Sequence, residues 1–252
     1  MFITTKALVL RSVVYKESSR ILTVLTADHG KLTVSARGAV RKNSRVAASV
    51  QPFALSDITL SKTRDRYVLT EAHVIEQFSE LQNDLERMSL GAYFLELLEA
   101  VSDEDSPNPE VLSLGLNALH VLCRTKNIRP AALVKSAFEL RLMCLAGYAP
   151  ITDACSACGR LIEESSQLDL TGGVVYCADC SADGDDTAPL CFDALTALRY
   201  ICSCESAKLY SFMLNPEPQR RLSNAAEGYI LAQLDRRFGS LEYYHKIKES
   251  FK

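Results

Sequence analysis

Residues 6–36 read KALVLRSVVYKESSRILTVLTADHGKLTVSA, three runs rich in Val, Leu, Ile and Thr that are separated by polar turns. Partial alternation of apolar and polar residues is typical of half-buried β-strands. With two similar runs downstream, the predicted strands cover residues 6–14, 20–28, 31–36, 53–61 and 66–76. Five antiparallel strands within residues 1–80 predict a small closed or nearly closed barrel. The oligonucleotide-binding (OB) fold is the common barrel of that size, although the pattern alone also allows other small barrels.

Charge is distributed unevenly along the chain. The 252 residues carry a net charge of -3, yet residues 1–70 hold 12 Lys and Arg against 4 Asp and Glu, a local charge of +8. The remaining residues hold 16 against 27, a local charge of -11. This segregation indicates that the basic head binds a polyanion, whereas the acidic body binds proteins or stays solvated.

The segment between the third and fourth predicted strands carries the densest positive charge. It reads ARGAVRKNSRVAASVQPF over residues 36–53. A charge run is often only a solvated loop, but the predicted barrel around it favours contacts with phosphates. The cations concerned are Arg37, Arg41, Lys42 and Arg45.

Aromatic residues are sparse in the head. Only Phe2, Tyr15, Phe53 and Tyr67 precede residue 70, and Phe53 is expected in the core because it leads into a strand. Single-strand binders commonly stack bases on aromatic rings. We therefore expect binding that depends mainly on phosphates, with little sequence specificity and a steep dependence on salt.

After Glu80 the pattern changes to helix, which predicts an α+β multidomain protein with a helical domain over 81–252. Asn83 and Asp84 offer N-cap chemistry for a helix that ends before Ser102. The other helices are predicted at about 109–126, 130–146, 191–203 and 217–238.

Two cysteine pairs, CSAC at 155–158 and CADC at 177–180, flank eighteen residues. This spacing is typical of a zinc ribbon, here inserted at about 150–190, with a predicted hairpin over 167–176 between the pairs. Four thiolates close a tetrahedral shell and leave no position for substrate, so the site is expected to be structural. An iron-sulfur cluster also accepts four thiolates, whereas a redox pair would need a helix start that neither pair has. The five remaining cysteines are expected to be inert packing.

Several functional classes lack support in the sequence. It contains no Walker A run, no G-x-S-x-G and no G-x-G-x-x-G, so we expect no enzymatic activity. The opening residues, MFITTK, have no apolar signal region, and no stretch approaches the roughly eighteen apolar residues of a membrane span. We expect a cytoplasmic protein.

Taken together, these features resemble the bacterial RecO family of DNA-repair proteins over essentially the whole chain. The similar motifs are Y-x-E-x-x-R-I at 15–21, T-x-x-x-G-K at 26–31, G-x-x-R-K-x-S-R at 38–45, Gln51-Pro52-Phe53 and the closing KIKESF at 246–251. Each is weak alone, but with the cysteine site they are fairly specific.

The resemblance implies an OB-fold domain, a helical domain and the role of a recombination mediator near the nucleoid. Family members bind single- and double-stranded DNA, anneal complementary strands, contact the acidic tail of the single-strand-binding protein SSB, and with RecR place RecA on SSB-coated DNA. It implies structural zinc on Cys155, Cys158, Cys177 and Cys180, although some relatives lack such cysteines. The implied DNA surface comprises Arg37, Arg41, Lys42, Arg45, Lys62, Arg64 and Arg66.

Cations on two predicted helices suggest a receptor for the SSB tail in the otherwise acidic body. They are Arg124, Lys126, Arg129, Lys135 and Arg141. Two other functions stay open. A zinc-ribbon transcription or translation factor would bind nucleic acid sequence-selectively, and an enzyme would need an unrecognised site among acidic residues that are more often solvated helix faces.

Overall fold

The computed structural model describes residues 2–63, 66–124, 130–180, 184 and 186–250. The chain forms two compact units: Met1–Cys123 with Gly239–Lys252, and Arg124–Phe238. This division by contacts groups three helices that follow residue 80 with the N-terminal strands.

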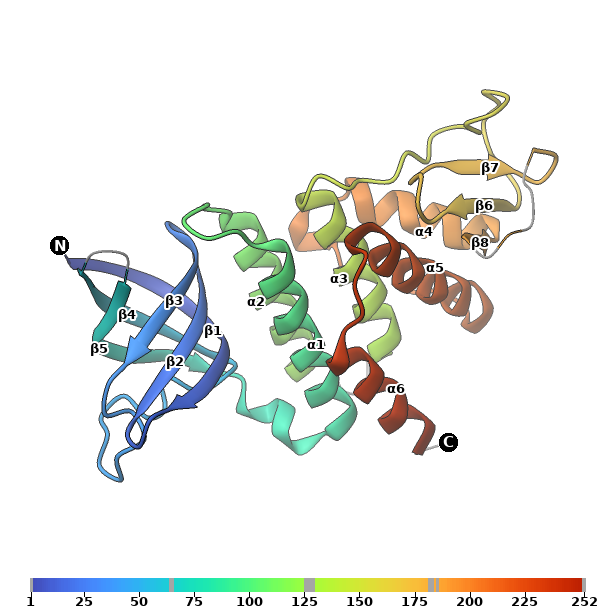
Figure 1. The fold of residues 1–252 in the computed structure, drawn as a ribbon. Helices are drawn as coiled ribbons and strands as arrows, with labels where there is room; N and C mark the ends of the chain where they lie inside the picture. The colour runs from blue at the N-terminus through green and yellow to red at the C-terminus, as the bar shows by residue number, and fades with distance from the viewer. Residues whose placement is uncertain (1, 64–65, 125–129, 181–183, 185, 251–252) are drawn as a thin grey trace. The chain divides into compact units, whose positions relative to one another are not determined.

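The first unit contains a closed five-stranded barrel (Figure 1). Its strands are β1 Phe2–Tyr15, β2 Ser19–Thr26, β3 Gly30–Ala36, β4 Ala54–Thr63 and β5 Arg66–Gln77. They close in the order β1-β2-β3-β5-β4. β3 and β5 pair in parallel through Val34 and Tyr67, and the other neighbours are antiparallel. This is the Greek-key arrangement of an OB-type barrel, so the predicted fold class is confirmed. The strands are not all antiparallel as predicted, because barrel closure aligns β3 with β5 in parallel.

Alternate residues of the strands fill the barrel. Val9, Val24, Leu32 and Leu60 are each at most 2% exposed. Full burial of such a side chain contributes about 1.5–3 kcal/mol relative to exposure. The register of β1 shifts between Val9 and Arg11, so its second half runs beyond the core as a hairpin with β2.

Helices α1 Leu85–Val101, α2 Pro109–Arg124 and α6 Gly239–Ser250 complete the first unit, after a short 3-10 turn, η1, at Ser79–Asn83. Asp84 caps α1 as predicted, since its side chain accepts from the Arg87 N–H at 3.2 Å. The barrel contacts the segment after α1 closely: Lys31 N–H donates to Asp103 O at 3.1 Å. A Cβ on Gly30, which has φ 64°, would lie 2.2 Å from Ser106 O, so only glycine fits there.

The second unit contains three helices and a small sheet of order β7-β6-β8 (Figure 1). Its elements are α3 Ala131–Leu145, β6 Ser166–Asp169, β7 Val175–Cys177, β8 Thr187–Leu190, α4 Phe192–Ser203, η2 Ser206–Lys208 and α5 Pro216–Leu234. The predicted hairpin is present as β6 and β7. In the described ranges, no helix combines the length and apolar composition that a bilayer crossing requires.

The largest differences from the sequence pattern are an early helix end, a first strand that begins four residues earlier, at Phe2, and a helix and a strand that were not predicted. The helix predicted over 217–238 ends at Leu234, because Asp235 adopts a left-handed φ of 44°. α6 was missed because its polar sequence buries only Leu241 and Tyr244. β8 was missed because its four residues are too few to show a period.

Candidate nucleic-acid interface and metal centre

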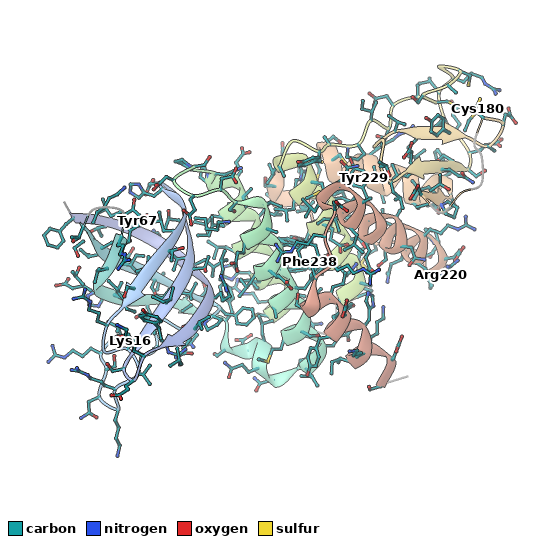
Figure 2. The ribbon with its side chains drawn as sticks, viewed as in Figure 1. Lys16, Tyr67, Cys180, Arg220, Tyr229 and Phe238 are labelled. Atoms are coloured by element: carbon teal, nitrogen blue, oxygen red, sulfur yellow. The ribbon has the colours of Figure 1, made fainter. Side chains whose placement is uncertain are left out.

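The β1–β2 hairpin and the long loop after β3 meet at one end of the barrel. Tyr15 pairs with Ser19, and Lys16 takes a left-handed φ of 57° in the turn between them. Ser18 O accepts from the Val40 N–H at 3.1 Å, which ties the loop to the turn. Figure 2 shows Lys16 at this end of the barrel. The loop is thereby held beside the hairpin instead of extending freely into solvent.

The loop itself is built from consecutive turns. Arg41 N–H donates to Gly38 O at 3.2 Å and Ser44 N–H to Arg41 O at 3.0 Å. Ala39 and Val50, 4% and 0% exposed, anchor it in the barrel core. Between these anchors, Arg41, Lys42, Asn43 and Arg45 are exposed.

We call the cations gathered here the basic end: Lys16, Arg20, Arg37, Arg41, Lys42 and Arg45. All are exposed except Arg20, which is half-buried and donates to Ser12 Oγ at 3.1 Å. No ion pair engages any of the six within the described part of the chain. Between residues 12 and 53 the carboxylates are Glu17 and Asp28, and Asp28 accepts from Thr5 Oγ1 at 3.2 Å. The basic end therefore sets six cations against Glu17, which lies in the same turn, and keeps a large excess of positive charge.

The other predicted DNA-contacting residues lie elsewhere on the barrel. Figure 2 shows Tyr67 at a different end from Lys16. Lys62 Nζ donates to Tyr67 Oη at 2.8 Å, and Tyr67 Oη donates to Asp105 Oδ1 at 3.0 Å. These residues line a surface hollow of about 160 Å³ together with Glu104. Nearby carboxylates weaken the attraction of Lys62 for a polyanion.

The structure therefore does not bring the seven predicted DNA contacts together. Four belong to the basic end, Lys62 and Arg66 are exposed near the β4–β5 connection, and Arg64 lies outside the described residues. Lys16 and Arg20 were not among the predicted contacts, because each is an isolated cation in the sequence. Lys16 lies in the turn between the first two strands and Arg20 lies at the start of the second, and this position at the end of a hairpin was the available signal.

Helix α1 occupies part of the outer face of the barrel. Arg11 on β1 donates to Glu99 Oε1 at 2.8 Å and to Thr23 Oγ1 on β2 at 3.4 Å. Lys31 Nζ on β3 donates to Glu99 O at 2.9 Å. OB folds commonly bind oligonucleotides across strands 2 and 3. Since these cations are engaged with α1, the basic end is the more available surface.

The second candidate site is the four-cysteine cluster, and the structure brings together all four predicted ligands. The sulfurs of Cys155, Cys158, Cys177 and Cys180 lie within 4.8 Å of one another, and Cys158 and Cys177 are 3.8 Å apart. A tetrahedral ion with metal–sulfur bonds of about 2.3 Å would separate its ligands by roughly 3.8 Å. The donor set therefore fits a tetrahedral, thiophilic metal ion.

Backbone geometry forms the two knuckles. Gly159 N–H donates to Cys155 O at 2.9 Å, and Gly159 takes φ 71°, as expected from its place after the first pair. Cys180 N–H donates to Cys177 O at 3.0 Å. β6 and β7 carry the second knuckle back to the first, because Ser156 N–H donates to Val175 O at 2.9 Å.

The thiols influence one another strongly. Hydrogen bonds from the backbone, first of all from Cys177, lower the pKa of Cys155 to about 6. A hydrogen bond between the side chains of Cys180 and Cys177 is the main cause that raises the pKa of Cys180 to about 12. A metal ion binds thiolates, so on binding it must displace the protons that remain on the thiols of higher pKa, above all that of Cys180. Arg160 supplies nearby positive charge, with Nε 3.4 Å from Cys158 Sγ and a 2.7 Å ion pair to Asp179.

Arg199 of α4 positions the chain before the first knuckle. Its guanidinium donates to Thr152 O at 2.9 and 2.6 Å, to Asp153 O at 3.2 Å and to Ile162 O at 3.3 Å. These carbonyls flank the first cysteine pair. Sequence reasoning missed Arg199, because no local pattern links it to a segment more than thirty residues earlier.

Lys135, predicted at the rim of a peptide receptor, is an internal charge. It is 1% exposed, and its Nζ lies 2.9 Å from Glu139 Oε1 and 2.7 Å from Glu227 Oε2. Burial opposes its charge, but the two carboxylates outweigh burial and raise the pKa of Lys135 above its ordinary value. Lys135 offers no surface to a peptide.

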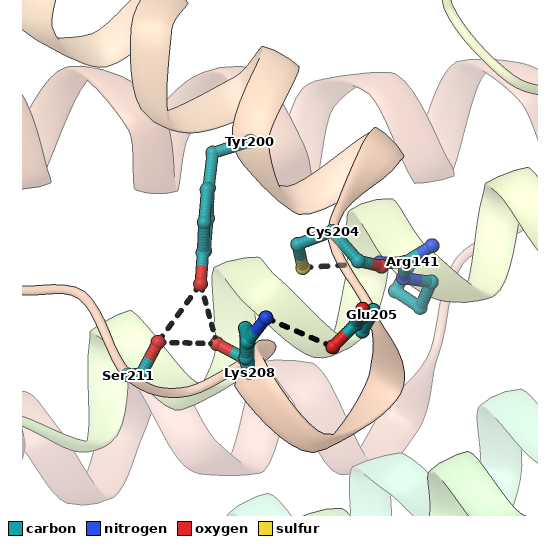
Figure 3. A network of polar contacts seen from close by, with 6 residues as sticks. All are labelled: Arg141, Tyr200, Cys204, Glu205, Lys208 and Ser211. Carbon is teal, nitrogen blue, oxygen red and sulfur yellow. Dashed lines mark hydrogen bonds and ion pairs between the residues drawn. The ribbon is translucent and has the colours of Figure 1, made fainter.

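Arg141 is also engaged inside its unit. It donates to Cys202 O at 3.1 Å, to Cys204 O and to Cys204 Sγ at 3.1 Å (Figure 3). Arg124 is exposed at the end of α2, and Lys126 and Arg129 lie outside the described residues. The described members of this predicted cluster are therefore not gathered at one surface.

The five other cysteines, Cys123, Cys144, Cys191, Cys202 and Cys204, are each partly buried. A hydrogen bond with Cys202 is the main cause that lowers the pKa of Cys144, and the same bond raises that of Cys202. Cys144 on α3 thus contacts Cys202 near the end of α4, and Arg141 on α3 contacts Cys204, which follows α4.

Fold and site define an OB-type barrel protein with a basic end, joined to a helical unit that carries a four-cysteine metal-site candidate. The sequence model of the recombination protein O N-terminal domain matches residues 1–78, and that of the C-terminal domain matches residues 82–242. The chain belongs to the RecO family of DNA repair and recombination proteins.

Relatives match along nearly the whole chain. The DNA repair protein RecO of Alkaliphilus metalliredigens is 32% identical over 250 residues, 98% of this chain and 100% of the relative. That of Desulforudis audaxviator is 31% identical over 244 residues, 96% of each chain. That of Acetivibrio thermocellus is 28% identical over 242 residues, again 96% of each.

Proposed function

We propose that this protein is a recombination mediator that binds single- and double-stranded DNA, anneals complementary strands and, with RecR, helps to load RecA onto SSB-coated single strands. The observation that supports this most is the basic end. Its six cations have no ion-pair partner in the described residues, and a loop anchored in the core presents four of them. Such a surface attracts a phosphate chain and releases its counterions.

Annealing follows from the same chemistry. Cations that neutralise phosphates lower the repulsion between two strands, while contacts to the backbone leave base edges free to pair. The primary contacts are Arg37, Arg41, Lys42 and Arg45, joined by Lys16 and Arg20. Lys62 and Arg66 provide a weaker contact at the other end of the barrel, because Asp105 is bonded to Tyr67 beside Lys62.

The test is annealing of complementary strands coated with SSB. Changing Arg41, Lys42 and Arg45 together to Glu should slow annealing strongly. The matched control reverses three exposed cations of the other unit, Lys208, Arg220 and Arg236, so that the net charge changes equally. Equal rates for wild type and the loop variant would remove the loop from the mechanism. Equal slowing in both variants would show that only net charge matters.

The four cysteines would hold a structural zinc ion, which supplies folding energy to a segment with little core of its own. Support comes from the sulfur separations and from the shell closed by four protein ligands. Elemental analysis of purified protein should find one zinc per chain. Iron, with visible absorption of a cluster, would contradict the assignment.

The helical unit would receive the acidic, apolar tail of SSB. Lys135 and Arg141 are engaged internally, so among the described candidates this proposal now depends on Arg124. Binding of a labelled tail peptide should weaken in Arg124→Glu and stay unchanged in Lys208→Glu. An unchanged affinity in Arg124→Glu would eliminate this residue as a contact. The protein would act in the cytoplasm, close to the nucleoid.

A further inference from the structure

Tyr15 is an aromatic side chain presented to solvent beside the basic end. It is 50% exposed, and its neighbours Val13 and Val14 are 49% and 57% exposed. These three residues alternate between the two faces of strand β1 at its end, where the hairpin extends beyond the barrel core. An aromatic ring and two aliphatic side chains in water leave apolar surface available for burial by a ligand.

The other aromatic residues of the barrel are placed differently. Phe53 is half-buried and packs against α1, where a Cβ on Gly91 would lie 3.0 Å from its Cε1 atom. Tyr67 is engaged with Lys62 and Asp105. Phe2 is 69% exposed but pairs with Ser61, near the β4–β5 connection. Tyr15 is therefore the barrel aromatic that shares a surface with the basic end.

Tyr15 has one cation directly beside it, and the loop that carries others is tied to the same turn. Lys16 Nζ lies 5.3 Å from the centroid of the Tyr15 ring. Ser18, two residues further along the turn, accepts from Val40 of the loop that carries Arg41 and Lys42. Each nucleotide of a flexible single strand presents a base face and a phosphate. An aromatic ring flanked by cations matches both groups.

We propose that Tyr15 stacks on a base of single-stranded DNA whose phosphates contact the basic end. The inference rests on the proposed DNA binding and adds a determinant of strand preference. Bases in a duplex are already stacked on their neighbours, so only a single strand offers a free base face to the ring. Tyr15 then contributes to single-strand affinity and contributes nothing to duplex affinity, which depends on phosphates alone.

The chain contains no tryptophan, so Tyr15→Trp introduces a unique fluorophore at this position. Binding of oligo(dT) should quench it, because a stacked base quenches indole emission. An abasic oligonucleotide of equal length and charge should bind without quenching. Tyr243→Trp, at a 49% exposed site on helix α6, is the matched control and should show no quenching.

Affinity provides the second measurement. Stacking contributes about 1–3 kcal/mol per base, so Tyr15→Ala should weaken binding to oligo(dT) about 5- to 150-fold. Tyr15→Phe should retain the affinity. The slope of affinity against salt should not change, because no cation is removed. Duplex binding should be equal for wild type and Tyr15→Ala.

Two results would overturn the inference while DNA binding stands. One is full binding of oligo(dT) by Tyr15→Trp, measured by anisotropy of the labelled strand, without quenching. The other is an equal loss of single-strand and duplex affinity in Tyr15→Ala. Absence of binding by wild type in dilute salt would instead reject the proposed function, and the inference with it.

Discussion

Replacing Lys135 by methionine should destabilise the second unit by about 3–5 kcal/mol, the usual cost of breaking a buried ion pair by removing one partner. Methionine keeps the shape and apolar contacts of the lysine stem but leaves Glu139, which is 0% exposed, without its cation. At an effective dielectric constant of 20, unit charges about 4 Å apart attract by about 4 kcal/mol. The Coulombic attraction and the usual cost of breaking a buried pair therefore agree in size.

The loss should depend on pH. Without Lys135, burial raises the pKa of Glu139, so the folded state binds a proton more readily than the unfolded state. The variant should therefore recover stability as pH falls towards the ordinary glutamate pKa of about 4.3. In wild type the pKa of Lys135 is raised, so its contribution is complete below the ordinary value and is lost only at more alkaline pH.

Urea unfolding followed by circular dichroism measures this effect. With a slope of about 1–3 kcal/mol per molar urea, the midpoint of the affected transition should fall by at least about 1 M. Lys208→Met is the matched control, because Lys208 also lies 2.9 Å from a glutamate, Glu205, but the pair is exposed (Figure 3). It should cost at most about 1 kcal/mol. Equal effects of both substitutions would refute the argument from burial.

Three further predictions concern single contacts. Arg199→Met should weaken metal binding about 10- to 100-fold, because it removes a contact that supports the first knuckle. Competition with a chromophoric chelator measures this affinity. An affinity equal to that of wild type would mean that the first knuckle forms without Arg199. Gly30→Ala should lower the stability measured by thermal unfolding by at least about 1–2 kcal/mol, because the backbone is left-handed and because Ser106 must move. Gly147→Ala is the control, since Gly147 has φ 88° but nothing lies within 4 Å of its added Cβ. Equal stability of the two variants would contradict the packing part of this prediction. Changing Lys62 and Arg66 to Ala should make the slope of log affinity for oligo(dT) against log salt concentration shallower by less than the roughly 1.4 expected for two lost phosphate contacts. An equal or larger change would place both residues in the principal contact surface.

The sequence alone determined the features that depend on neighbouring residues. Alternation identified the five strands, because side chains on a strand point to opposite faces in turn. The cysteine spacing identified the four sulfurs that the structure brings together, because each C-x-x-C knuckle is a local turn, and the Asp84 cap was visible for the same reason. The charge of the loop between β3 and β4 is likewise a local property of composition.

The tertiary structure decided which distant residues meet. Glu227 pairs with Lys135 from ninety-two positions away, which turns an expected surface cation into a buried one. Barrel closure places Tyr67, the partner of Lys62, at a different end from Lys16 and ties the loop to the turn that holds Lys16 (Figure 2). Helix α4 places Arg199 against the chain before Cys155. Burial and pairing depend on packing between segments that are remote in sequence, so no pattern read within a few residues contains them.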